Sequence, residues 1–185
     1  MDQRTAFRWG IVIVCASITI CEARGQDLRI PRELSANGAP CKANIDAAIV
    51  AFKAGNETLA LEQVNLGLTH CPGNATLVEL RGLVLFARGD YREASVAIHK
   101  IMGAGPGWTW STVNALYPNV ETYTKHLRAL EAHAKKHPDD GPARFLQAYH
   151  YLVIGAPKAA ERELEMVIRL EINDPIAADL LKKIR

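Results

Sequence analysis

Three histidines are the side chains of this sequence whose spacing could support metal chemistry. His126, His133 and His137 fall on one expected helix, and the last two have the i, i+4 spacing of a metal-binding pair. The stretch HAKKH lacks the glutamate of the zinc-protease pattern HExxH, and Lys135 and Lys136 would repel a cation. We therefore interpret it as a basic helix end and expect no bound metal.

Other chemistry-bearing motifs are missing from the sequence. It contains no G-x-S-x-G turn for a nucleophilic serine, no phosphate-binding glycine loop and no supported cysteine–histidine arrangement. Asp139 and Asp140 follow a proline and fit helix capping. We expect no enzyme activity and no cofactor, and keep a metal-binding or enzymatic protein only as a second alternative.

Composition and charge narrow the class of partner. The chain has 185 residues, of which 49% are hydrophobic and 23% charged, and its formal net charge is +2. These values are ordinary for a folded protein, and the balanced charge argues against a nucleic acid or a membrane surface as partner.

The first 25 residues have the pattern of a secretory signal. Arg4 and Arg8 precede an apolar run over 10–20, and the small residues Ala23 and Gly25 fit the positions before a cleavage site. We expect cleavage after Gly25, an exported protein that is periplasmic or secreted, and no membrane insertion afterwards; an uncleaved anchor is the alternative. Residues 26–40 lack a helical period and are expected to form a linker or arm.

An internal repeat organises the rest of the chain. The stretches AFKAGNETLALEQV (51–64), LFARGDYREASVAI (85–98) and YLVIGAPKAAEREL (151–164) share a glycine at the fifth place and an alanine at the tenth. The first two glycines are 34 residues apart, as are Pro72 and Pro106, whereas Pro138 follows after 32. Each glycine suits the turn that follows the first helix of a unit. Each alanine lies inside the second helix, where a small side chain lets two helices approach closely. Each proline suits the end of a unit, because proline cannot continue a helix. The shared residues are Gly55, Gly89, Gly155, Ala60, Ala94 and Ala160.

This pattern resembles the tetratricopeptide repeat (TPR) over about 41–185. The slots of that family are matched by Gly82, Gly89, Tyr91, Ala94 and Pro106 in one unit and by Ala148, Tyr151, Gly155 and Ala160 in another. The resemblance implies an all-α, right-handed solenoid of about four antiparallel helical hairpins, with units at about 41–74, 75–108, 109–140 and 141–174 and a capping helix over 175–185. The third unit, two residues short, is degenerate. The stretch 105–140 also resembles a recurring variant in secreted bacterial repeat proteins of unknown role.

Two cysteines remain after removal of 1–25. Cys41 begins the first helix of the first unit and Cys71 ends the second, so an antiparallel hairpin brings them together. We expect a disulfide, with free buried thiols as the alternative; a redox or metal pair would need a different spacing.

Two tryptophans stand in the break between the second and third units. The stretch GPGWTWSTVNALYP places Trp108 and Trp110 before a short helix at about 110–117, and a longer helix is expected over 120–136. The tryptophans could plug a gap left by the short helix. Alternatively, they could form an aromatic binding patch with Tyr117.

The concave face is the main expected binding surface. In TPR proteins the first helix of each hairpin lines the concave face. The resemblance therefore implies that five apolar residues of this chain lie on that face: Phe52, Phe86, Phe145, Tyr149 and Leu152. An exposed apolar groove would bind a peptide or helix of another exported protein; the alternative is that these side chains pack between repeats. We therefore expect a non-catalytic protein-interaction scaffold, or alternatively a subunit of a larger envelope assembly whose groove is already filled. The oligomeric state is not readable from the sequence.

Overall fold

The computed structural model describes residues 39–171 and 173–185, in which all regular structure is helical. The expected signal (1–25) and the linker up to residue 38 lie outside the described residues. The helices are α1 (Ala39–Lys53), α2 (Glu57–His70), α3 (Ala75–Arg88), α4 (Tyr91–Ala104), α5 (Trp110–Leu116), α6 (Val120–Lys136), α7 (Gly141–Val153), α8 (Pro157–Leu170) and α9 (Pro175–Ile184).

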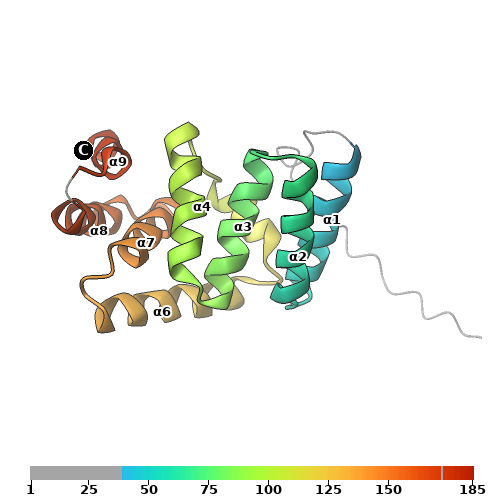
Figure 1. Cartoon of the computed structure of the whole chain (residues 1–185). Helices are drawn as coiled ribbons and strands as arrows, with labels where there is room; N and C mark the ends of the chain where they lie inside the picture. Colours follow the sequence, from blue (N-terminus) through green and yellow to red (C-terminus); the bar gives the residue numbers. More distant parts are fainter. Residues whose placement is uncertain (1–38, 172) are drawn as a thin grey trace, which may run out of the picture.

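Three antiparallel hairpins form the body of the molecule. Helix α1 pairs with α2, α3 with α4 and α7 with α8, and neighbouring hairpins pack through α2 on α3 and α4 on α7. Figure 1 shows these helices following one another from the N-terminal to the C-terminal end, with α9 against α8 at the end of the row. This arrangement confirms the predicted all-α, TPR-like solenoid.

Glycine makes the turn inside each hairpin. Gly55, Gly89 and Gly155 have φ angles of +73°, +84° and +74°. This is the left-handed region that side chains with a Cβ atom disfavour, so the repeated glycine is explained by the backbone conformation of the turn.

Small residues allow the paired helices to approach closely. Ala60, Ala94 and Ala160, at equivalent places in α2, α4 and α8, are all 0% exposed. In α3, a Cβ atom on Gly82 would lie 2.6 Å from the Cδ1 atom of Ile98 in α4. A larger side chain at these positions would force the helices apart.

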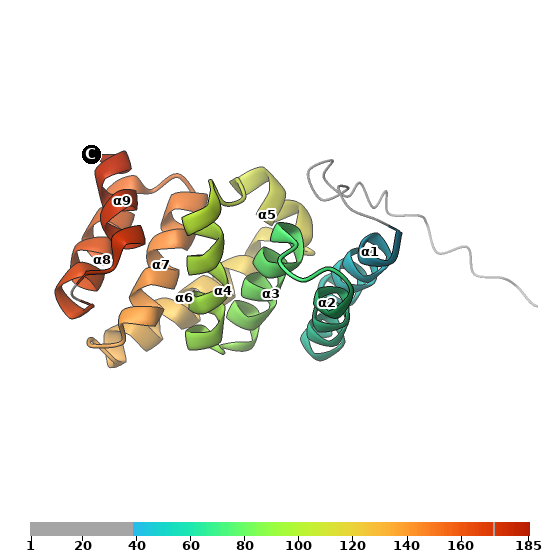
Figure 2. The same cartoon turned by 45° about the horizontal axis from the view of Figure 1, so that its top comes forward.

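The third unit departs from the hairpin form. Helix α5 is only 7 residues long, and it does not pack along α6. Instead α4 packs directly on α7, so the third unit is left out of the row of hairpins. Figure 1 shows α6 running crosswise to α3 and α4, and Figure 2 shows α5 and α6 behind the row. Pro118 helps to explain why α5 is short, because it follows the helix closely and a proline cannot continue a helix.

A disulfide closes the N-terminal hairpin. It joins Cys41 in α1 to Cys71 after α2, and the two Cα atoms are 6.2 Å apart. This separation lies in the usual range for a disulfide. The bridge ties the end of the solenoid that has no preceding hairpin in the described residues.

Candidate functional site

The face made by the first helices of the hairpins, α1, α3 and α7, is covered by the chain's own third unit. Helix α5 contacts α1, and α6 contacts both α3 and α7. Aromatic rings meet across this boundary: Phe52 of α1 lies 4.9 Å from Tyr117, and Phe86 of α3 lies 6.2 Å from Tyr123 of α6, between ring centroids. We call this surface the first-helix face.

This covering corrects the expectation of an open apolar groove. Four of the five side chains expected to line it, Phe52, Phe86, Phe145 and Tyr149, are 1–3% exposed. Phe145 packs between hairpins instead, with its ring 4.9 Å from that of His99 in α4. Only Leu152 remains half-buried. In this structure a partner cannot reach Phe52 or Phe86 without displacing part of the chain, whereas Phe145 and Tyr149 each touch a hollow with their edge.

His150 sits at the centre of the covered face as a neutral side chain. Its ring stacks on Phe86 at 3.8 Å, and its Nδ1 atom lies 3.1 Å from the hydroxyl of Tyr123. Burial, with a smaller contribution from the charge of His126, lowers the pKa of His150 to about 3. The imidazole therefore stays uncharged at neutral pH and belongs to the core of this aromatic cluster.

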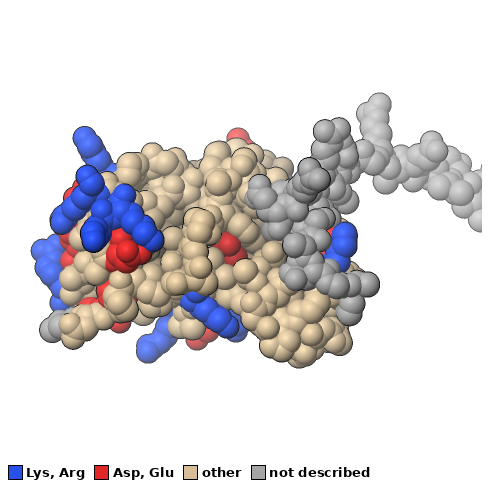
Figure 3. Space-filling model, turned by 90° about the horizontal axis from the view of Figure 1, so that it is seen from above, with Lys and Arg blue, Asp and Glu red and all other residues tan. Residues whose placement is uncertain are grey.

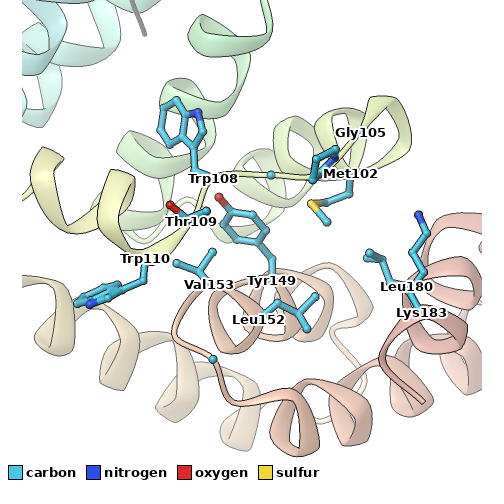
Figure 4. Close-up of a pocket in the computed structure, with 13 residues that line it drawn as sticks. Met102, Gly105, Trp108, Thr109, Trp110, Tyr149, Leu152, Val153, Leu180 and Lys183 are labelled. Carbon is cyan, nitrogen blue, oxygen red and sulfur yellow. The ribbon is translucent and has the colours of Figure 1, made fainter. Parts of the chain in front are cut away.

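One open hollow among the described residues lies beside the tryptophan-containing break. It has a volume of about 630 Å³, within the range of pockets that hold ligands. Figure 4 shows Trp108, Thr109 and Trp110 on one side, Leu180 and Lys183 of α9 on the other, and Tyr149 and Leu152 of α7 between them. We call it the tryptophan cleft; its lining residues are Met102, Gly105, Pro106, Gly107, Trp108, Thr109, Trp110, Tyr149, Leu152, Val153, Gly155, Leu180 and Lys183.

The two tryptophans both pack on the core and line this cleft. Trp108 and Trp110 are half-buried against core residues, and the ring of Trp110 lies 4.9 Å from that of Tyr123. Tyr117, the third member of the expected aromatic patch, is only 4% exposed and does not line the cleft. The tryptophans thus pack on the core at the edge of this hollow, and Tyr117 belongs to the buried cluster. Binding of a partner by the two indoles stays a prediction.

A buried carboxylate holds the tryptophan segment in place. The backbone N–H of Trp108 donates to Oε1 of Glu79 at 2.6 Å, and the hydroxyl of Tyr149 donates to the same oxygen at 2.7 Å. Glu79 belongs to α3 and is 3% exposed. A Cβ atom on Gly107 would lie 2.9–3.1 Å from Tyr149, Glu79 and Met102, so glycine allows this close approach. The sequence analysis did not identify Glu79. The feature that could have indicated it is an acidic residue among the apolar residues of an expected helix.

Burial sets the ionisation of Glu79. Loss of solvent raises its pKa from the ordinary value of 4.5, although the hydrogen bonds from Trp108 and Tyr149 act in the opposite direction. The folded chain therefore holds this proton more tightly than the unfolded chain. Between pH 4.5 and the raised pKa, the contribution of Glu79 to stability falls as the pH rises.

Substitutions at Glu79 separate its hydrogen bonds from its charge. Glu79→Ala is expected to lower the free energy of unfolding by roughly 1–3 kcal/mol, because two buried donors lose their acceptor. Glu79→Gln keeps an acceptor oxygen and removes the ionisation, so its loss at pH 7 should be smaller and its stability should depend less on pH above 4.5. Urea unfolding followed by circular dichroism at several pH values measures both effects. Equal losses in the two variants would contradict this account of Glu79.

The three histidines of α6 and its C-terminal end have different neighbours. The Nε2 atom of His133 lies 2.8 Å from a carboxylate oxygen of Asp140, which caps α7, and the rings of His133 and His137 lie 4.6 Å apart. His126 faces Tyr117 instead. In the part of the chain that the structure describes, no group of three or more His, Cys, Asp or Glu side chains could hold a metal ion.

Comparison with known proteins finds only solved structures of low similarity to this chain. A scan against protein-family models and a search of curated protein sequences gave no match. Two solved structures are similar in outline: the "MamA RS-1 ArsTM double mutant" and "MamA 41-end from Desulfovibrio magneticus RS-1". Each has 18% sequence identity and a TM-score of 0.37; the match covers 80% of this chain and 94% or 95% of theirs. At this level neither assigns a function or a partner to this chain.

Proposed function

We propose that this protein is a non-catalytic scaffold that binds another protein through the tryptophan cleft. The observation that carries the proposal is the covering of the first-helix face by α5 and α6. That face is the expected binding surface of such a solenoid, and here it is filled, whereas the cleft stays open. Half-buried tryptophans beside a hollow are suited to hold an apolar anchor side chain of a partner.

The partner is proposed to be another exported protein. The sequence of residues 1–25 has the pattern of a secretory signal, and the bridge between Cys41 and Cys71 is typical of oxidising compartments. No helix among the described residues is both long and apolar enough to cross a membrane. Together these features support a periplasmic or secreted location.

A second candidate function is that of a subunit in a larger envelope assembly. It is favoured by the same covering of the first-helix face, because a filled groove leaves the outer surfaces to make contacts. Several large apolar side chains are exposed outside the cleft, among them Val50, Leu66 and Val96 at 51%, 47% and 66%. Stable co-purification of many copies or subunits, unaffected by changes in the cleft, would favour this function.

A pair of substitutions tests binding at the cleft. Leu152→Asp places a charge in the cleft, and we expect it to abolish capture of the partner from envelope extract by the full chain, because an apolar anchor would meet a carboxylate. Leu66→Asp makes the same change on α2, at a residue 47% exposed and outside the cleft, and should leave capture intact. Affinity capture with mass spectrometry measures the result, after circular dichroism shows that both variants fold. The proposal would be wrong if the Leu152→Asp variant still captured the partner, or if the parent chain captured none.

A further inference from the structure

The charges around the tryptophan cleft indicate what kind of segment it takes. Resting on the function proposed above, we propose that the cleft binds an extended segment of the partner that carries an apolar anchor residue and a nearby acidic residue. The apolar side chain occupies the cleft beside Leu152, and the acidic side chain pairs with Lys183.

One charged side chain lines the cleft among the described residues. It is Lys183 of α9, and its neighbours in the lining include the apolar side chains of Met102, Leu152 and Leu180. Figure 4 shows Lys183 at the end of the cleft opposite the tryptophans. Because Lys183 is exposed, its attraction for a carboxylate of the partner is modest, as it is for exposed ion pairs in general.

The present partner of Lys183 does not block this role. Its Nζ atom lies 2.6 Å from a carboxylate oxygen of Asp179, one turn earlier in α9. Both side chains are highly exposed, at 64% and 55%. Exposed ion pairs of this kind contribute little to stability, so the ammonium group can turn to a carboxylate of the partner.

The acidic residue of the segment is assigned to the α9 end of the cleft. Lys183 is the charged side chain that lines the cleft among the described residues, whereas the lining at the other end is formed by Trp108 and Trp110. The apolar residue then lies between Trp108 and Leu152, and the acid lies beside Lys183.

A second hollow indicates that the segment continues beyond Lys183. It has a volume of about 310 Å³ and shares Met102, Gly105 and Lys183 with the tryptophan cleft. Its other lining residues come from the end of α4 and the start of α9. Figure 3 shows basic and acidic side chains gathered together at the C-terminal end of the molecule. Because the chain of a partner has room to pass Lys183, the structure favours an acidic side chain within a segment over a free terminal carboxylate.

Selection from a random peptide library tests this preference. The probe is a displayed library of random 12-residue peptides with fixed sequences on both sides, selected on the full oxidised chain. We expect enrichment of peptides with Asp or Glu two residues from an apolar residue, since alternate side chains of an extended chain share a face. A synthetic peptide of this type should bind about two- to five-fold more tightly than its Gln counterpart. Lys183→Glu should remove that difference. Lys182→Glu, the same charge change at an exposed neighbour that does not line the cleft, should keep it.

The outcomes separate this inference from the function on which it rests. Selected peptides that lose binding in Leu152→Asp but bind equally with Glu or Gln would overturn the role of Lys183 and leave the cleft as the binding site. Peptides whose binding Leu152→Asp does not change, or a selection that enriches no peptide, would overturn both. An effect of Lys182→Glu equal to that of Lys183→Glu would show general attraction to a basic helix end, and would also overturn the pairing with Lys183.

Discussion

Phe86→Ala is expected to lower the free energy of unfolding by about 3–5 kcal/mol, one of the largest effects of any single substitution in this chain. The ring of Phe86 is 1% exposed and lies between three elements: it belongs to α3, stacks on His150 of α7 and faces Tyr123 and His126 of α6. Removing it opens a cavity where the third unit rests on the first-helix face. Urea unfolding followed by circular dichroism measures the loss.

A matched change at the surface controls for loss of apolar area alone. Val96→Ala in α4, at a residue 66% exposed, should change the free energy of unfolding by less than about 0.5 kcal/mol. Equal small losses in both variants would mean that α6 does not pack on Phe86 in solution. A charged substitution at Phe86 would disrupt folding for the same reason, so binding is better tested at half-buried cleft residues such as Leu152.

Loss of the disulfide is the second large effect that the structure predicts. The double variant Cys41→Ala/Cys71→Ala should be less stable than the parent by roughly 3–4 kcal/mol, because the bridge closes a loop of about 30 residues in the unfolded chain. The bridge also ties α1, the end helix of the described solenoid, to the hairpin next to α3. Chemical unfolding under oxidising conditions measures the difference between parent and variant.

Reduction of the parent chain provides the control for this prediction. With a thiol reductant the parent should unfold at nearly the same denaturant concentration as the double variant, which itself should not respond to reductant. If the parent unfolds at the same concentration with and without reductant, the bridge does not stabilise the fold. The expected stabilisation would then have to be abandoned.

The filled first-helix face changes where binding is sought. A solenoid of open hairpins presents its first helices to a partner, but here Tyr117 and Tyr123 already pack on Phe52 and Phe86. The third unit thus acts as part of the core. One surface that this arrangement leaves open is the tryptophan cleft, where α4, α7 and α9 meet the segment before α5.

The sequence by itself determined the helices and the turns between them. Repeating glycines predicted the turns at Gly55, Gly89 and Gly155, and their positive φ angles give the physical reason. The short helix expected at about 110–117 is found at Trp110–Leu116, and the long one expected over 120–136 at Val120–Lys136. These features are local: proline, glycine and capping residues fix a helix end through the backbone of a few neighbours.

Only the tertiary structure decided how the third unit is used. Its sequence is patterned as two helices, and the pattern says nothing about whether they pack on each other or on α1, α3 and α7. That choice depends on contacts between residues far apart in the chain, such as Phe86 with Tyr123 and Trp108 with Glu79. The apolar side chains of the first-helix face gain more by being covered within the chain than by facing water, and this burial removed the expected groove. The same packing left the tryptophans at the edge of the third unit, where they line the cleft.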